Sequence, residues 1–408
     1  MSCNNVNVEP VVIGGGNGST AYDAFGRLRV SNPLTIFDSK NTMSKNNLFD
    51  EALTNNGTVT YTANKSTVNL NVTTASGDKV IRQSKRVMSY QPGKSLLNLN
   101  TFVMQTPEAN LKQKVGMFNA NNGIFFMADG TTLKIVRRTY VTGSAVDTEK
   151  SQSEWNGDKL DGTGASGYNL SVDKASILFM DFEWLGMGAV RIGFVIDGKF
   201  IVAHTFKNAN DLTTVYMQTA NLPIRYEIET TGTISGTAVL QQVCSTTIIE
   251  GGYAPEGVRK MIGTSQINVG VNLTTANTYY NIATIRIKSG RPYAVIVPSG
   301  LDVLNISNND FEFGLFLNAT PSSAFSYTSF DDNVEYDLTT VDLTSTGTRV
   351  AGGYMGGKTA PFSIGQGFVF ANQLGQTISG TSDTLTLGVR SGSANGDVSA
   401  LLKWYDLT

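Results

Sequence analysis

Two carboxylates two residues apart, Asp181 and Glu183 in the run FMDFEW, are the side chains of this sequence best placed for catalysis. Residues two apart on a strand point to one face, and glycoside hydrolysis needs two carboxylates flanking one bond. Some β-sandwich glycoside hydrolases place three acids in alternation on a strand, but the third acid is missing here. The alternative is a solvated strand face or an ion pair with Arg191. We favour this non-catalytic alternative, because Asp310 and Glu312 repeat the spacing elsewhere.

The histidine and one glycine motif are the other features that could support chemistry. His204 is the only histidine, which rules out clustered histidine metal sites and leaves one ring for any nucleophilic triad. It lies in the strand-like run KFIVAHTF without a G-x-S-x-G motif, so we interpret it as a strand residue satisfied by its neighbours. Gly162, Gly164 and Gly167 match the G-x-G-x-x-G fingerprint, but no buried strand precedes them and no helix follows, so we predict a loop.

A sugar-binding surface without catalysis would need aromatic rings and side-chain amides on a shallow groove. Trp155, Trp184 and Tyr216, together with the many asparagines, could supply them. The alternative is that these aromatic residues fill the core of a sandwich. No D-x-[DN]-x-[DN]-G calcium loop occurs, and we predict neither a cofactor nor a metal.

The composition limits the classes of function. With 408 residues and 40% hydrophobic content the chain can form two domains or three, while 16% charged residues and a net charge of -2 do not indicate a nucleic-acid-binding face. Cys3 and Cys244 lie far apart, so we expect no disulfide framework and assembly in a reducing cytoplasm. The sequence has no recognisable signal peptide and no apolar run of roughly 20 residues, so we predict neither secretion nor membrane insertion.

Strand signals dominate the chain. Apolar residues alternate with polar ones in TVTYTANKSTVNLNVTT and in AVRIGFVIDGKFIV, where Asp197-Gly198 predicts a two-residue hairpin. Further hairpin signals occur at Asn122-Gly123 and Asp129-Gly130. The best helix candidate is 106–118, TPEANLKQKVGMF, with a possible N-cap followed by proline.

These signals predict an all-β protein of tandem antiparallel β-sandwich or jelly-roll domains with an extended N-terminal arm. Residues 1–45 form the arm, which is rich in glycine and has no helical period, although a plain first strand with loops is the alternative. A first sandwich covers 46–250, GGYAPEG at 251–257 is a Gly/Pro linker, and a second jelly-roll-like β-domain covers 258–408.

Four segments carry a resemblance to a known family: DFEWLGMGAVRIGFVIDGKFIVAHTFKNANDLTTVYMQTANLPIRYE, AYDAFGRLRVSNPLTIFDSKN, VGMFNANNGIFF and SDTLTLGVRSGSANGDVSALLKW. With them the chain resembles the β-rich virion structural proteins of tailed bacteriophages and large DNA viruses, which have a lectin-like jelly-roll fold. The resemblance spans most of the chain and implies that 46–250 is lectin-like.

The resemblance implies a non-enzymatic virion structural protein, assembled in the host cytoplasm, with a capsid-decoration or minor-capsid role favoured. Its expected partners are copies of itself, as a homotrimer, and other capsid or tail proteins. The arm would make assembly contacts through Tyr22, Phe25, Arg27, Arg29 and Pro33. The alternative is a tail-fibre or spike module that binds host-surface glycans and could cleave them through the acids named above.

Overall fold

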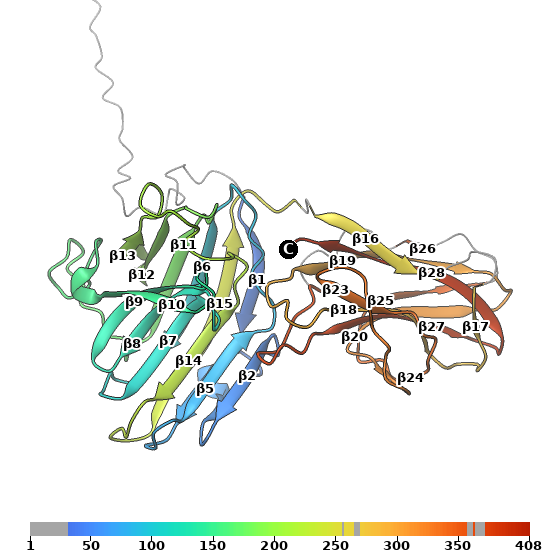
Figure 1. Cartoon of the computed structure of the whole chain (residues 1–408). Coiled ribbons are helices and arrows are strands. Elements are labelled where there is room, and N and C mark those ends of the chain that lie inside the picture. The colour runs from blue at the N-terminus through green and yellow to red at the C-terminus, as the bar shows by residue number, and fades with distance from the viewer. Residues whose placement is uncertain (1–31, 255–256, 265–269, 357–361, 364–371) are drawn as a thin grey trace, which may run out of the picture.

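The computed structural model is all-β, and its only helices within the described residues are two short 3-10 turns, η1 (Ala63–Lys65) and η2 (Gln152–Glu154) (Figure 1). The structure describes residues 32–254, 257–264, 270–356, 362–363 and 372–408. Of the expected arm contacts, Tyr22, Phe25, Arg27 and Arg29 therefore lie outside the described residues. Pro33 is exposed immediately before the first strand.

Two antiparallel sheets face each other in the first sandwich. The first sheet runs in the order β13 (Lys199–Phe206), β12 (Val190–Ile196), β11 (Ser176–Phe182), β6 (Leu96–Val103), β15 (Ala238–Ile249), β4 (Thr67–Val72) and β3 (Thr58–Thr62), with β1 (Leu34–Lys40) also paired to β15. The second runs in the order β10 (Val146–Ser151), β9 (Thr132–Thr139), β8 (Gly123–Asp129), β7 (Leu111–Phe118), β14 (Ile224–Thr230), β5 (Lys79–Ser84) and β2 (Phe49–Thr54). The alternation of apolar side chains buries one face of each sheet, and the shared core includes Val68, Leu70, Phe102, Ile124, Phe126, Leu178, Ile192 and Tyr226.

β1 shows how the described part of the expected arm behaves. It pairs antiparallel with β15, from Leu34 opposite Ile249 to Lys40 opposite Cys244. Phe37 is buried in the core of the first sandwich. Residues 34–40 are thus a strand of that sandwich, as in the alternative considered for this segment.

The helix expected at 106–118 is wrong. Leu111–Phe118 is β7, which hydrogen-bonds to β14 on one side and to β8 on the other. Leu111, Val115 and Met117 all point into the core. They are four and two residues apart, as expected for side chains on one face of a strand. The N-cap signal before them was local, whereas pairing with two neighbouring strands satisfies the whole backbone of the segment.

The Asp197-Gly198 hairpin is confirmed. Both residues have positive φ, 50° and 73°, and they join β12 to β13. A two-residue turn with positive φ at both central positions matches the right-handed twist of its strands.

The second domain also consists of antiparallel sheets. One runs in the order β16 (Val258–Gly263), β28 (Gly396–Asp406), β19 (Ile296–Asn305) and β26 (Phe362–Ser363), with β17 (Val271–Leu273) paired to β28. The other runs in the order β22 (Thr328–Ser329), β23 (Val334–Asp337), β18 (Tyr280–Ile287), β27 (Thr384–Ser391), β20 (Phe311–Leu317) and β25 (Thr348–Met355), and β21 (Thr320–Pro321) pairs with β24 (Leu343–Ser345). Their shared core includes Ile282, Ile285, Phe313, Leu387, Val398, Leu402 and Trp404.

The two domains contact each other directly (Figure 1). Val87 of the first sandwich is buried against Val295 and Val297 of the second domain. The backbone N–H of Ile378 donates a hydrogen bond to Asp50 Oδ2 at 2.7 Å. The junction therefore combines an apolar contact with hydrogen bonds across it.

Candidate functional site

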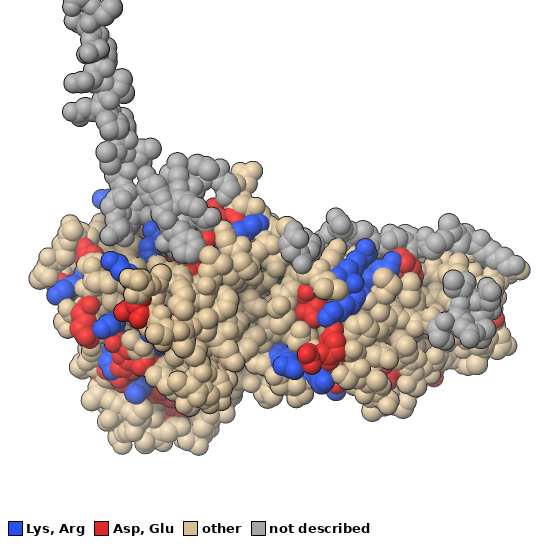
Figure 2. Space-filling model, turned by 45° about the horizontal axis from the view of Figure 1, so that its top comes forward, with Lys and Arg blue, Asp and Glu red and all other residues tan. Residues whose placement is uncertain are grey.

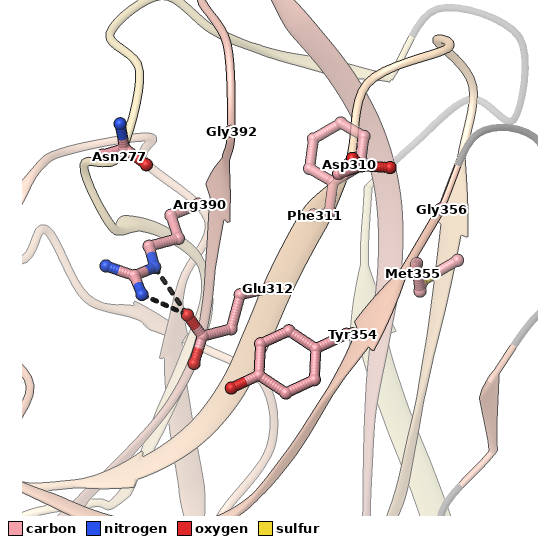
Figure 3. Close-up of a pocket in the computed structure, with 9 residues that line it drawn as sticks. All are labelled: Asn277, Asp310, Phe311, Glu312, Tyr354, Met355, Gly356, Arg390 and Gly392. Atoms are coloured by element: carbon pink, nitrogen blue, oxygen red, sulfur yellow. Dashed lines mark hydrogen bonds and ion pairs between the residues drawn. The ribbon is translucent and has the colours of Figure 1, made fainter.

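A hollow of about 380 Å³ opens where β20, β25 and β27 end side by side in the second domain (Figure 3). Its lining mixes two carboxylates, one guanidinium, one amide and two aromatic rings: Asn277, Asp310, Phe311, Glu312, Tyr354, Met355, Gly356, Arg390 and Gly392. The volume lies within the range of roughly 300–1,000 Å³ that is common for ligand sites.

Strand register places the central side chains in one row. Glu312 on β20 lies opposite Tyr354 on β25 and opposite Arg390 on β27. Residues directly opposite each other on antiparallel strands share a face, so the three side chains are neighbours. The Tyr354 residue is 77% exposed, whereas only 10% of the Glu312 side chain is accessible. An open ring therefore lies beside a carboxylate that is held within the surface.

Glu312 is held by two arginines and a tyrosine. Arg390 Nε donates to Glu312 Oε2 at 2.7 Å, Arg349 Nη1 donates to Oε1, and the Tyr279 hydroxyl also hydrogen-bonds the carboxylate. Burial opposes ionisation, but these hydrogen bonds outweigh it and lower the pKa of Glu312. Burial and the neighbouring carboxylate raise the pKa of Tyr279 to about 12. The Arg390 guanidinium also lies 4.9 Å from the centre of the Tyr279 ring.

A row of three glycines supports this arrangement. Gly314 on β20 lies opposite Gly352 on β25 and Gly388 on β27, one step along the same face from the Glu312 row. A Cβ at Gly314 would lie 2.4 Å from Phe316 Cζ, and one at Gly352 would lie 2.4 Å from Arg349 Nη2. The missing side chains thus make room for the Phe316 ring and for the arginine that holds Glu312.

This chemistry suits recognition better than proton transfer. Glu312 is ionised and committed to several donors, so it is a poor general acid. The row offers fixed acceptors, guanidinium donors and a planar apolar ring, with the carboxylate of Asp310 also lining the hollow. Such a set matches a ligand that has hydroxyl groups together with an apolar face.

The structure places Asp181 and Glu183 together but buries both completely. Asp181 forms an ion pair with Arg191, the alternative given from the sequence, and accepts a hydrogen bond from Ser95. Removing one partner of such a buried ion pair is strongly destabilising, because it leaves an uncompensated buried charge. Substrate could reach these acids only after the strands rearranged.

The three aromatic residues considered for glycan contact do not form a common platform. Trp155 and Tyr216 are 3% and 2% exposed and belong to the core of the first sandwich. Trp184 is partly buried, and its Nε1 donates to the carbonyl oxygen of Met217 at 3.1 Å. The rings of Trp155 and Tyr216 therefore pack in the core, which is the alternative weighed for them.

His204 and the glycine motif have structural roles. His204 is 4% exposed, its Nδ1 accepts a hydrogen bond from the backbone of Asn156 at 3.3 Å, and burial lowers its pKa to about 4. Gly162 and Gly167 have positive φ in a loop, as predicted. Gly164 packs against Asp158, where a Cβ would lie 2.1 Å from the carboxylate.

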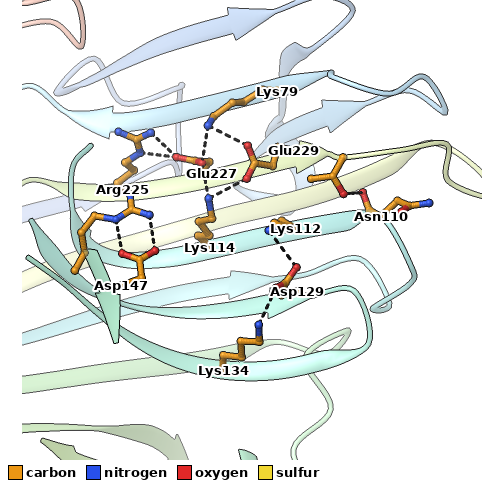
Figure 4. A network of polar contacts seen from close by, with 12 residues as sticks. Lys79, Asn110, Lys112, Lys114, Asp129, Lys134, Asp147, Arg225, Glu227 and Glu229 are labelled. Carbon is orange, nitrogen blue, oxygen red and sulfur yellow. Dashed lines mark hydrogen bonds and ion pairs between the residues drawn. The ribbon is translucent and has the colours of Figure 1, made fainter. Parts of the chain in front are cut away.

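A second polar cluster covers the outer face of β14 and its neighbours (Figure 4). Glu227 is 2% exposed and pairs with Lys79 and Lys114 at 2.9 Å and with Arg225. Burial opposes its ionisation, but the three positive charges outweigh that effect and hold its pKa far below the usual range. Because its acidic and basic side chains form ion pairs with one another, we interpret the cluster as a structural feature of the sheet and not as a ligand-binding surface. On the face in Figure 2, both signs of charge are likewise interspersed.

Sequence reasoning missed the residues of the hollow. In the sequence, Asp310 and Glu312 stand out only as a repeat of the spacing of Asp181 and Glu183. Tyr354 sits in the run AGGYMGG, where a lone aromatic residue among glycines signals a ring without covering neighbours. The contribution of Arg390 could not be read from the sequence, because it depends on the register of β27 against β20.

Two kinds of feature are absent from the described residues. No described helix has the length and apolar character needed to cross a membrane. No group of three or more His, Cys, Asp or Glu side chains is arranged to hold a metal ion in the part of the chain that the structure describes.

Fold and site together define a tandem antiparallel β-sandwich protein with a shallow polar hollow in its second domain. Among solved structures the chain is similar to a GH16 protein from Bacteroides ovatus, at 9% identity over 52% of this chain and 99% of that one, with a TM-score of 0.34. It is similar to arcelin-5, a lectin-like defence protein from Phaseolus vulgaris, at 8% identity over 53% and 98%, with a TM-score of 0.32. A structure of an HCR/D mutant matches 89% of this chain and 96% of its own, at 11% identity and a TM-score of 0.33. No family model and no curated protein matches the sequence.

Proposed function

We propose that this protein is a non-enzymatic virion-surface protein, of the tail-fibre or spike type, that binds host glycans through the hollow lined by Tyr354, Glu312 and Arg390. The virion location rests on the sequence resemblance described above. The glycan-binding role rests on the exposed ring of Tyr354 beside a polar cluster that is already fixed in place.

The physical match is between the two kinds of surface on a sugar ring and the two kinds of group in the hollow. A pyranose presents an apolar C–H face that can stack on the tyrosine, and hydroxyl groups that can donate to carboxylates and accept from guanidinium N–H groups. Because the arginines and Glu312 are already in place, little side-chain entropy is lost on binding. The volume of about 380 Å³ suits roughly one or two sugar units.

Binding to a glycan array, with a Tyr354→Ala variant, tests the glycan half of the proposal. We expect wild-type protein to bind a defined subset of glycans, and the variant to lose at least about tenfold in affinity, as expected for an aromatic anchor. The melting temperature should change little, since the ring is exposed. Met261→Ala, at a residue 49% exposed on β16, is the matched control and should bind normally. Equal binding by both variants would refute the role of the hollow.

A reducing-sugar assay on the bound glycans tests the non-enzymatic half, and we expect no turnover. Immunogold electron microscopy of purified virions tests the location. Label confined to the tail or its tip is the expected result. Label over the head would instead support the capsid-decoration role. The homotrimer is a separate prediction from the resemblance.

A further inference from the structure

The junction between the domains contains a second cavity, distinct from the hollow. Its volume is about 170 Å³, and both domains contribute to its wall. The first sandwich supplies the end of β5, two basic residues and the loop before β8: Gln83, Ser84, Lys85, Val87, Asn119, Ala120, Asn121, Pro223 and Arg225. The second domain supplies Pro292 and the segment that holds Gln376, Thr377, Ile378 and Gly380.

Side-chain NH2 groups are left over in this cavity as hydrogen-bond donors. Asn119 Oδ1 already accepts from the backbone N–H groups of Asn121 and Asn122, at 2.8 and 2.9 Å, so its NH2 group is what remains. Gln83 Oε1 accepts one hydrogen bond, from Arg225 Nη1 at 3.3 Å, which orients the amide and leaves its NH2 group and one lone pair of its oxygen. These accepted bonds fix the orientation of both amides.

The charged side chains that line the cavity, Lys85 and Arg225, are both positive. None of the described residues that line the cavity is Asp or Glu. The guanidinium of Arg225 is paired with Glu227, whereas the Lys85 ammonium forms no ion pair or hydrogen bond with any described residue. The carboxylates that border the cavity, Asp50 and Asp383, accept hydrogen bonds from the backbone N–H groups of Ile378 and Gly375. Lys85 therefore adds an ammonium without an ion-pair partner among the described residues to a wall that also holds two amide donors.

We propose that this cavity binds a compact oxyanion, a carboxylate, sulfate or phosphate group, and that the bound group ties the two domains together. Acceptor oxygens with negative charge are what a wall of amide NH2 groups and an ammonium satisfies. The volume is below that of sites that enclose whole drug-sized ligands, so a compact group fits and an oligomer does not. The proposal is independent of glycan binding at the hollow.

Isothermal titration calorimetry of the full chain with inorganic phosphate, at constant ionic strength, tests this site. We expect one saturable site per chain. Asn119→Asp keeps an oxygen for both accepted backbone bonds but replaces the remaining donor by a negatively charged acceptor. It should lower phosphate affinity at least tenfold while the circular dichroism spectrum stays unchanged. Lys85→Met should lower the affinity by a similar factor.

Asn64→Asp is the matched control, because Asn64 is exposed in η1 between β3 and β4 of the opposite sheet. It adds the same charge and should leave phosphate binding as in the wild type. An absence of saturable binding, or wild-type affinity in Asn119→Asp, would overturn the proposal. Repeating the titration with acetate and sulfate shows which oxyanion binds best, and preference for any one of them is consistent with the donor set.

Discussion

At the scale of single residues, burial decides which polar side chains can act on a ligand and which maintain the fold. Asp181 and Glu312 are both carboxylates paired with arginine, yet Asp181 is fully buried on β11 whereas Glu312 lies at the floor of an open hollow. The same pairing chemistry therefore lies in the interior of one domain and, in the other, holds a carboxylate in the hollow that we propose as the binding site.

His204 should make the stability of the protein depend on pH. Burial and the positive charge of Lys150 outweigh the effect of Glu154 and lower the pKa of His204 to about 4, from the ordinary 6.5. The unfolded chain therefore takes up a proton at a higher pH than the folded one. The stabilisation is fully present above about pH 6.5 and is lost as the pH falls from 6.5 towards 4. Between pH 7 and 5.5 we expect a loss of about 1 kcal/mol, measured by urea unfolding. His204→Gln should show a flatter profile, and identical slopes in the two proteins would contradict this account.

Individual site residues were hard to predict from the sequence, for a physical reason. Asp181 and Glu183 are of the right types for catalysis, but the surroundings of Asp181 include Ser95, just before β6, and Arg191 on β12, which are distant from it in the sequence or on another strand. Conversely, Tyr354 is exposed because the β25 segment around it is glycine-rich and at the edge of its sheet. Exposure is a tertiary property that spacing along one strand does not encode.

At the scale of elements, the glycine row across β20, β25 and β27 should be intolerant of even one methyl group. In Gly314→Ala the new Cβ would meet the Phe316 ring at 2.4 Å, and that ring is only 1% exposed and has little room to move. We expect the free energy of unfolding to fall by about 1–3 kcal/mol, as for other overpacked sites. Chemical denaturation followed by tryptophan fluorescence, with Trp404 as the reporter in that domain, measures it.

Gly236→Ala is the control for this substitution. Its Cβ would meet no atom within 4 Å, and its φ lies outside the left-handed region. We expect a change of less than about 0.5 kcal/mol in the free energy of unfolding. A Gly→Ala change by itself reduces the entropy of the unfolded chain and is slightly stabilising. A similar loss in both variants would therefore contradict the Phe316 contact as the cause of the cost at Gly314.

Elements were the part of the structure that the sequence predicted best. Period-two alternation and the Asp197-Gly198 turn identified strands and a hairpin correctly, because both signals are local and repeated. The error at 106–118 arose where a short N-cap signal was weighed above the alternation of Leu111, Val115 and Met117. The positions of β7 between β14 and β8, and of β1 beside β15, depend on contacts far apart in the chain, which no local pattern contains.

At the scale of the whole molecule, the all-β class follows from composition and periodicity, but the docking of the two domains does not. The apolar part of the junction consists of Val87, Val295 and Val297. The sequence around them does not distinguish these valines from ordinary strand or loop residues. Additional hydrogen bonds cross it, including Gln376 N to the carbonyl oxygen of Lys85 at 2.7 Å. Because these contacts bury apolar surface and pair backbone groups, we expect the domains to unfold in a coupled manner.

Val87→Asp should uncouple the domains, since it would bury a carboxylate against Val295 and Val297. Leaving that charge buried would cost several kcal/mol, so the junction should open instead while each core stays folded. We expect one calorimetric unfolding transition to split into two and the radius of gyration from X-ray scattering to increase. Val258→Asp introduces the same charge at a residue 68% exposed on β16 and should do neither. A single transition and a wild-type radius of gyration in Val87→Asp would mean that the junction contributes little to holding the domains together. A bound oxyanion in the neighbouring cavity could then not be what links them.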